Sequence, residues 1–113
     1  MRLIEQPIAV SEVRALAKAQ FGEMIKAAVD IERGVMALGG ELHSDEEALL
    51  LESGSRQEDV WGINLYPDKT GAELVEFDSM INVRPSHGNR SRGVDDPKIQ
   101  ARILVVVARL VRP

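Results

Sequence analysis

The segment from Asp96 to Leu110 constrains the fold of this 113-residue chain more than any other. Asp96 and Pro97 form a typical helix start, because aspartate caps the first free amides and proline fits the first helical position. Apolar residues then recur at helical spacing, and from Ile103 to Ala108 they cover almost every side of the helix. Such a helix is either buried against other elements or shared with a partner. We therefore favour a homodimer over a monomer.

The composition indicates a soluble cytoplasmic protein with a single domain, residues 1–113. The apolar fraction of 44% is ordinary for a globular protein. Cysteine is absent, which excludes a disulfide framework and a cysteine nucleophile. The net charge of −4 argues against general nucleic-acid binding, which depends on basic surfaces. No apolar run approaches the roughly 20 residues that cross a membrane, so we expect no membrane association.

The first third of the chain is predicted to form a helix followed by a hairpin. The helix covers Ser11–Phe21, with its first serine as the cap and Gly22 as a stop. The same apolar spacing also permits a longer helix that continues through Ala28. We prefer strands at Ile25–Ile31 and Val35–Leu38, because apolar and charged residues alternate in the first of them.

A second helix and a second hairpin are predicted for the middle of the chain. The helix, about Asp45–Glu52, follows a capping box formed by Ser44 and Glu47. The hairpin joins Val60–Tyr66 to Glu73–Val83 across a turn rich in proline and glycine. With the C-terminal helix, these elements predict an α+β fold. It has an antiparallel sheet of about four strands and three helices on one face.

Several segments resemble, in combination, a family of small bacterial and archaeal proteins catalogued as a domain of unknown function. The similarity spans nearly the whole chain, and its main segments are Gly39–Glu47, Trp61–Pro67, Glu76–Ser79, Ile81–Pro85 and Gly88–Gly93. That family has no assigned activity. The resemblance therefore implies a single domain, but it implies no catalytic residue and no cofactor.

The loop from Asn82 to Gly93, called the arginine loop below, has the clearest potential for binding an anion. It contains three arginines and one histidine but no carboxylate. Guanidinium groups bind phosphate or carboxylate through paired hydrogen bonds, and glycine amides can add to them. The candidate ligand-binding residues of the loop are Arg84, His87, Asn89, Arg90 and Arg92.

An alternative for the arginine loop is that its arginines pair with carboxylates of the same chain. The nearest candidates in sequence are Glu76, Asp78, Asp95 and Asp96. Because these carboxylates suffice for all three arginines, we favour internal pairing. The loop would then hold the fold together, or join subunits through the acidic segment Glu41–Asp59.

A polar pocket is predicted beside the strand that contains Trp61. This tryptophan shares the apolar side of its strand with Ile63, so we assign it to the core. Asn64 and Tyr66 lie on the opposite side, and Glu76 and Asp78 share one side of the next strand. These four side chains line either a pocket or a solvated face of the sheet.

A metal site is a further hypothesis. If a strand continued through them, Glu41, His43 and Asp45 would point the same way and could hold a divalent ion for hydrolysis. His87 would then be a candidate acid or base. The alternative explains Asp45 through helix capping and His43 as a surface residue.

The leading functional hypothesis is an oligomeric binding module that contacts a small anionic ligand or a partner through the arginine loop. A metal-assisted hydrolase and a purely structural protein are the alternatives. The sequence leaves open whether the protein is an enzyme.

Overall fold

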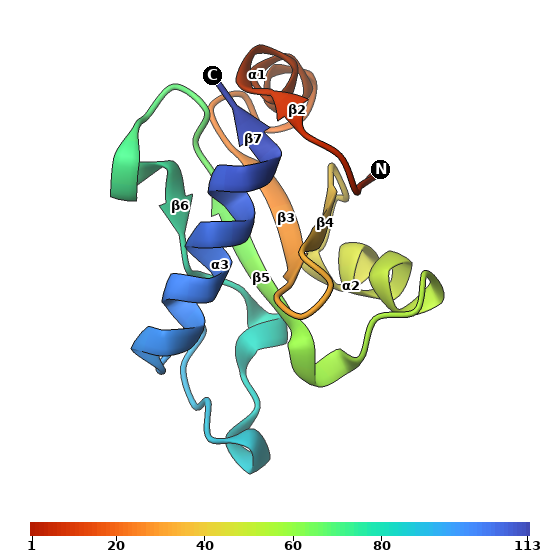
Figure 1. Ribbon diagram of the computed structural model, residues 1–113, viewed down its shortest axis with the longest axis vertical. Coiled ribbons are helices and arrows are strands. Elements are labelled where there is room, and N and C mark those ends of the chain that lie inside the picture. The colour runs from red at the N-terminus through yellow and green to blue at the C-terminus, as the bar shows by residue number, and fades with distance from the viewer.

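An antiparallel sheet of five strands forms the centre of the computed structural model, which describes residues 1–113 (Figure 1). In spatial order the strands are β1 (Arg2–Ile4), β4 (Val35–Leu38), β3 (Ile25–Asp30), β5 (Val60–Leu65) and β6 (Val75–Glu76). The α+β fold and the hairpin of β3 and β4 are confirmed. The sheet has one strand more than predicted, because the three residues of β1 are too few to show a pattern. A separate parallel pair joins β2 (Ile8–Ala9) to β7 (Val111–Arg112).

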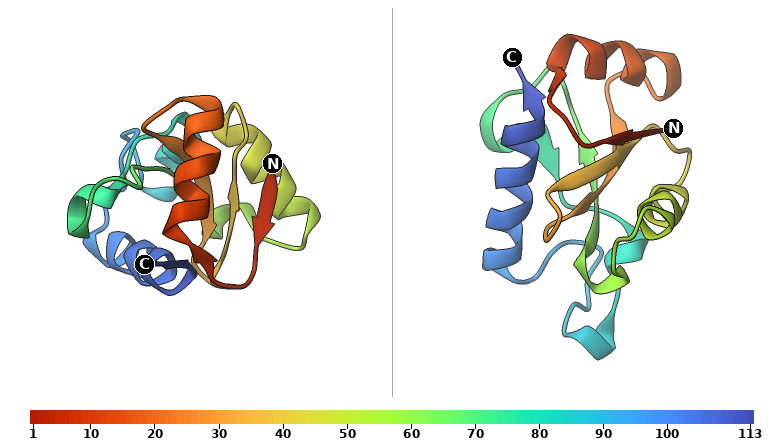
Figure 2. Two further views of the ribbon diagram at one scale, coloured as in Figure 1. Left: turned by 90° about the horizontal axis from the view of Figure 1, so that it is seen from above. Right: turned by 45° about the vertical axis from the view of Figure 1, so that its right-hand side comes forward.

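The three helices are α1 (Val10–Gln20), α2 (His43–Glu52) and α3 (Pro97–Leu110). They cover both faces of the sheet, not one face as predicted. In Figure 2, α3 and α2 lie on opposite sides of the strands, and α1 lies across one end. The physical reason is that the central strands are apolar on both faces, since every residue of β4 and β5 is buried. No helix is long and apolar enough to span a membrane.

The larger core lies between the sheet and the pair α1 and α3. Trp61 belongs to this core, as predicted, and is 5% exposed. The smaller core lies under α2, where Leu50 packs against Ala28 and Ala37. These two alanines let the helix approach the strands closely. On α3 the buried residues are Ile103, Val106, Val107 and Leu110, whereas Val105 on the other side of the helix is exposed.

The helix ends follow local sequence rules only in part. The Asp96 cap is confirmed, since its Oδ1 accepts a hydrogen bond from the amide of Lys98 at 2.8 Å. α1 begins one residue before Ser11 and has no side-chain cap. It stops before Gly22, whose φ of 93° is left-handed, so the longer helix is excluded. The prediction of a capping box at Ser44 and Glu47 was wrong, because α2 already begins at His43 and no side chain caps it.

The second hairpin is much shorter than predicted. β6 pairs with β5 over two residues only, and the chain then leaves the sheet for a short helical turn at Met80–Asn82. The Asn82 side chain pairs with the next part of the β5 edge. Its Oδ1 accepts from the Gly62 amide at 2.8 Å, and its Nδ2 donates to the Gly62 carbonyl at 2.9 Å. A single buried side chain thus takes the place of a strand.

Candidate functional site

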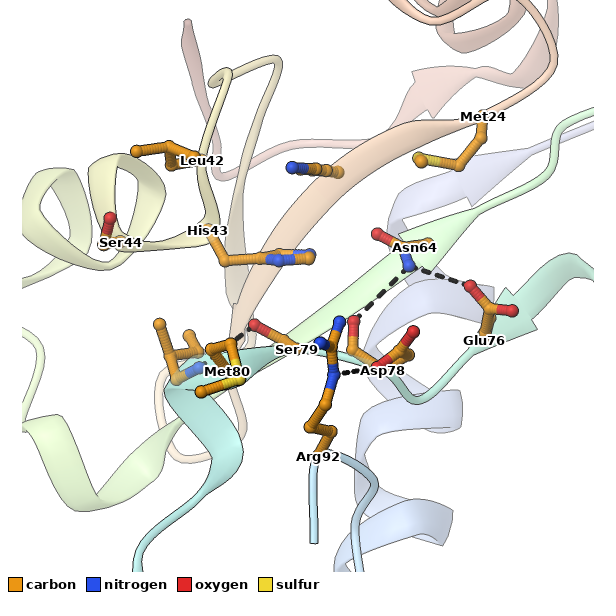
Figure 3. Close-up of a pocket in the computed structure, with 12 residues that line it drawn as sticks. Met24, Leu42, His43, Ser44, Asn64, Glu76, Asp78, Ser79, Met80 and Arg92 are labelled. Atoms are coloured by element: carbon orange, nitrogen blue, oxygen red, sulfur yellow. Dashed lines mark hydrogen bonds and ion pairs between the residues drawn. The ribbon is translucent and has the colours of Figure 1, made fainter.

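A pocket of about 390 Å³ opens where the first turn of α2 meets the strands β3, β5 and β6 (Figure 3). It lies on the face of the sheet that α2 covers, next to the N-terminal end of that helix. Its lining combines charged, amide, hydroxyl and apolar groups: Met24, Lys26, Leu42, His43, Ser44, Asn64, Glu76, Asp78, Ser79, Met80, Ile81 and Arg92. The pocket brings together groups from the predicted polar strand face, the predicted metal site and the arginine loop.

Three polar residues in one row across the sheet form the floor of the pocket. Lys26 of β3 is in register with Asn64 of β5, and Asn64 is in register with Glu76 of β6. Residues in register on neighbouring antiparallel strands point to the same face, so their side chains meet. The strand pairing therefore adds Lys26 to the site, which the sequence did not suggest.

Asn64 is deeply buried in the pocket, with 6% of its surface exposed. Its Nδ2 donates to Oε1 of Glu76 at 2.8 Å and to the carbonyl of Asp78 at 3.4 Å. Its Oδ1 is buried and accepts no hydrogen bond. In Figure 3 this oxygen is turned toward the side of the pocket on which His43 lies. A buried acceptor without a donor is costly, and a ligand that donated to it would remove that cost.

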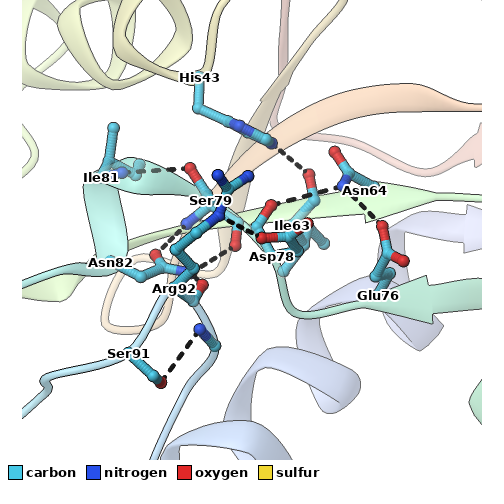
Figure 4. A network of polar contacts seen from close by, with 12 residues as sticks. His43, Ile63, Asn64, Glu76, Asp78, Ser79, Ile81, Asn82, Ser91 and Arg92 are labelled. Atoms are coloured by element: carbon cyan, nitrogen blue, oxygen red, sulfur yellow. Dashed lines mark hydrogen bonds and ion pairs between the residues drawn. The ribbon is translucent and has the colours of Figure 1, made fainter.

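His43 is held in one orientation by the sheet. Its Nε2 lies 2.8 Å from the carbonyl of Ile63 (Figure 4). A carbonyl oxygen only accepts, so Nε2 carries the proton and Nδ1 is an acceptor in the neutral ring. Burial is the main cause that lowers the pKa of His43, and the charge of Lys26 lowers it further, although the bond to Ile63, the neighbouring Asn64 side chain and the charge of Asp78 oppose both. The ring is therefore neutral at neutral pH.

Two cations reach the pocket with donors to spare. Arg92 donates from Nε to Oδ1 of Asp78 at 2.6 Å, and neither of its Nη atoms has a partner in the protein. The guanidinium group of Arg92 points toward His43 in Figure 3. Lys26 donates to the carbonyl of Glu41 at 2.9 Å, which uses one of its three ammonium protons.

A protein-family model matches residues 2–110, which is nearly the whole chain. The chain belongs to the DUF5674 family. This family is described as proteins of unknown function, which confirms the resemblance seen in the sequence. Neither the curated proteins nor the solved structures include a significant match to this chain. Membership in DUF5674 therefore assigns no activity, and function has to be argued from the pocket.

The three arginines of the arginine loop have three different environments in the DUF5674 structure. Arg92 pairs with Asp78, as internal pairing predicted. Arg84 pairs instead with Glu47 on α2, at 3.2 Å, and donates to the carbonyl of Val60 at 2.6 Å. The side chain of Arg90 is exposed and makes no hydrogen bond or ion pair. One arginine thus fastens the loop, one borders the pocket, and one faces solvent.

The remaining candidates of the arginine loop lie outside the pocket. The Nδ2 of Asn89 donates to three carbonyl oxygens of the loop, and its Oδ1 accepts from the amide of Asp95, so this buried residue shapes the loop. His87 lies exposed on the turn Pro85–His87. Tyr66 lies beside the pocket and donates from its hydroxyl to Oε1 of Glu76 at 3.2 Å.

The residues of the predicted metal site do not share a site in the DUF5674 structure. The strand on which their alignment depended ends at Leu38, and His43 starts a helix. His43 lines the pocket described above, whereas Glu41 and Asp45 line a different one. No group of three histidine, aspartate or glutamate side chains lies close enough to hold a metal ion.

Arg84→Ala is expected to lower the free energy of unfolding by about 2–3 kcal/mol, because it leaves Glu47 partly buried without its cation. The Arg84 and Glu47 side chains are 11% and 14% exposed, and the guanidinium also lies 5.1 Å from the Trp61 ring centroid. Urea denaturation measures the loss. Arg90→Ala is the matched control and should change stability by less than about 0.5 kcal/mol. Equal effects of the two substitutions would show that Arg84 is not a fastener.

Proposed function

We propose that this DUF5674 protein is a binding module whose pocket holds a small ligand with an anionic group. Two sets of unpartnered atoms on the pocket wall support the proposal: the Nη atoms of Arg92 and the buried Oδ1 of Asn64. A guanidinium group binds carboxylate or phosphate through two parallel hydrogen bonds. An orphaned buried acceptor favours a ligand that also carries an N–H or O–H donor.

Lys26 supports the same ligand chemistry. Its ammonium group keeps two protons after the bond to Glu41, and it lies in register with Asn64 on the pocket floor. The nearby carboxylate of Asp78 holds only the Nε of Arg92. The guanidinium therefore stays oriented, while its outer edge remains available to an anion.

This proposal narrows the role of the arginine loop to Arg92. Arg84 is occupied by Glu47, and the exposed Arg90 and His87 do not line the pocket. Tyr66 acts through Glu76, which it helps to hold beside Asn64.

Thermal unfolding with a panel of small anions tests the proposal. Phosphate, sulfate, acetate and succinate are added separately at low ionic strength, and at least one is expected to raise the Tm of the wild type. A ligand at one hundred times its Kd stabilises the folded state by about 2.7 kcal/mol, which gives a measurable shift. Arg92→Ala should abolish the shift, and because the Arg92 side chain is 57% exposed, the variant should fold.

Arg90→Ala is the matched control, since it removes the same charge from the same loop outside the pocket. It should keep the anion-dependent shift. The proposal fails if no anion stabilises the wild type, or if Arg92→Ala responds as strongly as Arg90→Ala. Calorimetric titration of the best anion gives the affinity.

A further inference from the structure

The charged groups of the pocket balance one another. Lys26 and Arg92 provide two positive charges, and Glu76 and Asp78 provide two negative charges. Balanced charges in separate positions complement a ligand that has both a cationic and an anionic group.

Arg92 and Asn64, which carry the free donor and acceptor groups of the pocket, both bond to Asp78 (Figure 4). Oδ1 of Asp78 accepts from Arg92 at 2.6 Å, while its backbone carbonyl accepts from Asn64 at 3.4 Å. Asp78 thus binds the Nε of Arg92 and the Nδ2 of Asn64, and it leaves the Nη atoms of Arg92 and the Oδ1 of Asn64 free. Because Arg92 and Asn64 line one pocket of about 390 Å³, a ligand that meets both is a small molecule that carries an anionic group and a donor group.

Glu76 places a negative charge beside the Asn64 side chain. Its Oε1 accepts from both Asn64 and Tyr66, and its Oε2 has no partner. A ligand donor at Asn64 would therefore meet a neutral acceptor whose own amide nitrogen is bonded to a carboxylate. This combination favours a cationic donor such as an ammonium group over a neutral amide.

Apolar side chains surround the mouth of the pocket. Leu42 is 56% exposed and Met80 is 65% exposed, and the half-buried Met24 completes the rim in Figure 3. Methionine adapts its shape to different apolar partners, which suits a ligand-contacting surface. An apolar group of the ligand would cover these side chains and withdraw them from water.

We infer that the ligand is a free α-amino acid with an apolar side chain. This inference rests on the proposed function and names the class of its ligand. The carboxylate binds Arg92 and Lys26, and the ammonium group donates to Oδ1 of Asn64 beside Glu76. The side chain packs on Met24, Leu42 and Met80. An α-amino acid carries its two charged groups on a single carbon, so it can present both within one small pocket.

Calorimetric titrations at low ionic strength test this class with L-methionine as the probe. Comparison ligands are the analogue without the amino group, the amide without the carboxylate charge, and the N-acetylated form. L-methionine is expected to bind at least about tenfold more tightly than each of them, because each loses one charge-assisted interaction.

Two variants separate the parts of the proposed site. Glu76→Gln should weaken the binding of L-methionine about tenfold. It should leave the binding of the analogue without the amino group unchanged, since only the ammonium group meets that charge. Glu73→Gln, an exposed glutamate outside the pocket, is its control. Met80→Ala should weaken the binding of L-methionine more than the binding of glycine. Val105→Ala, which is 67% exposed on α3, is the control for that substitution.

The outcomes distinguish this inference from the proposed function. If the analogue without the amino group binds as tightly as L-methionine and loses affinity in Arg92→Ala, the amino-acid class is overturned and the anion pocket stands. Equal binding of the N-acetylated form points to a peptide end and also overturns the class. If none of these compounds and no simple anion binds in an Arg92-dependent way, both ideas fail.

Discussion

Asn82→Ala is expected to lower the free energy of unfolding by about 3–5 kcal/mol, one of the two largest effects expected of a single substitution here. The Asn82 side chain is fully buried and makes hydrogen bonds to both backbone groups of Gly62 and to the carbonyl of Arg92, at 2.8–3.0 Å. Alanine leaves the N–H and C=O of Gly62 buried without partners. Each unpaired group costs about 1–3 kcal/mol.

Urea denaturation of wild type and Asn82→Ala measures this loss, and hydrogen exchange of the Gly62 amide localises it. The Gly62 amide should lose protection more than the amides between β3 and β4. Ser86→Ala, an exposed substitution in the same loop, is the control and should be nearly neutral. An unchanged exchange rate at Gly62 would contradict the role assigned to Asn82.

Glu46→Gln is expected to raise stability at alkaline pH by about 4 kcal/mol. Glu46 is fully buried on α2; its Oε2 accepts from the amide of Gly40 at 2.9 Å, and its Oε1 has no partner. Burial raises the pKa of Glu46 from 4.5 to about 8, against the smaller opposing effects of the Gly40 amide and of Lys26. Glutamine keeps the shape of the protonated side chain and removes the cost of charging it.

The sign of the pH dependence follows from proton binding. Between the unfolded pKa of 4.5 and the folded pKa of about 8, the folded state keeps a proton that the unfolded state releases. The contribution of Glu46 to stability is therefore full below pH 4.5, falls as the pH rises, and is lost above about pH 8. Glutamine has no such dependence, so the advantage of the variant grows with pH.

Chemical denaturation of both proteins at several pH values between about 5 and 9 measures the difference. His43, whose pKa is lowered by burial, gives the opposite slope in acid, but it is common to both proteins and cancels. Glu52 on the same helix is exposed, so the stability of Glu52→Gln should depend on pH in the same way as that of the wild type. Parallel curves for Glu46→Gln and wild type would show that Glu46 is already ionised in the folded protein.

For the arginine loop, internal pairing and ligand binding were alternatives in the sequence, but in the structure each applies to different residues of the loop. Arg84 is paired internally, and its guanidinium group bonds to the Val60 carbonyl at the edge of the sheet. In Arg92 only the Nε is paired internally. The outer edge of Arg92 remains available, which supports a ligand role for that residue alone. Neighbouring residues of one loop can thus serve stability and binding separately.

Elements with strong local signals could be predicted from the sequence. The hairpin at Ile25–Leu38 follows from alternation around a glycine turn, and the start of α3 follows from the capping rules for Asp96 and Pro97. The predicted strand over Glu73–Val83 was wrong beyond Glu76. Apolar spacing cannot show that a buried asparagine, rather than backbone, will complete a sheet edge.

By itself, the sequence determined the fold class, the core position of Trp61 and the common side of Asn64 and Tyr66, because these depend on residue type and on spacing along one strand. Only the tertiary structure decided that Lys26, His43 and Arg92 join Asn64 in one pocket. They come from β3, α2 and the arginine loop. Their meeting depends on strand order and on the placement of α2 across the second sheet face, and these are set by long-range packing that no local pattern encodes.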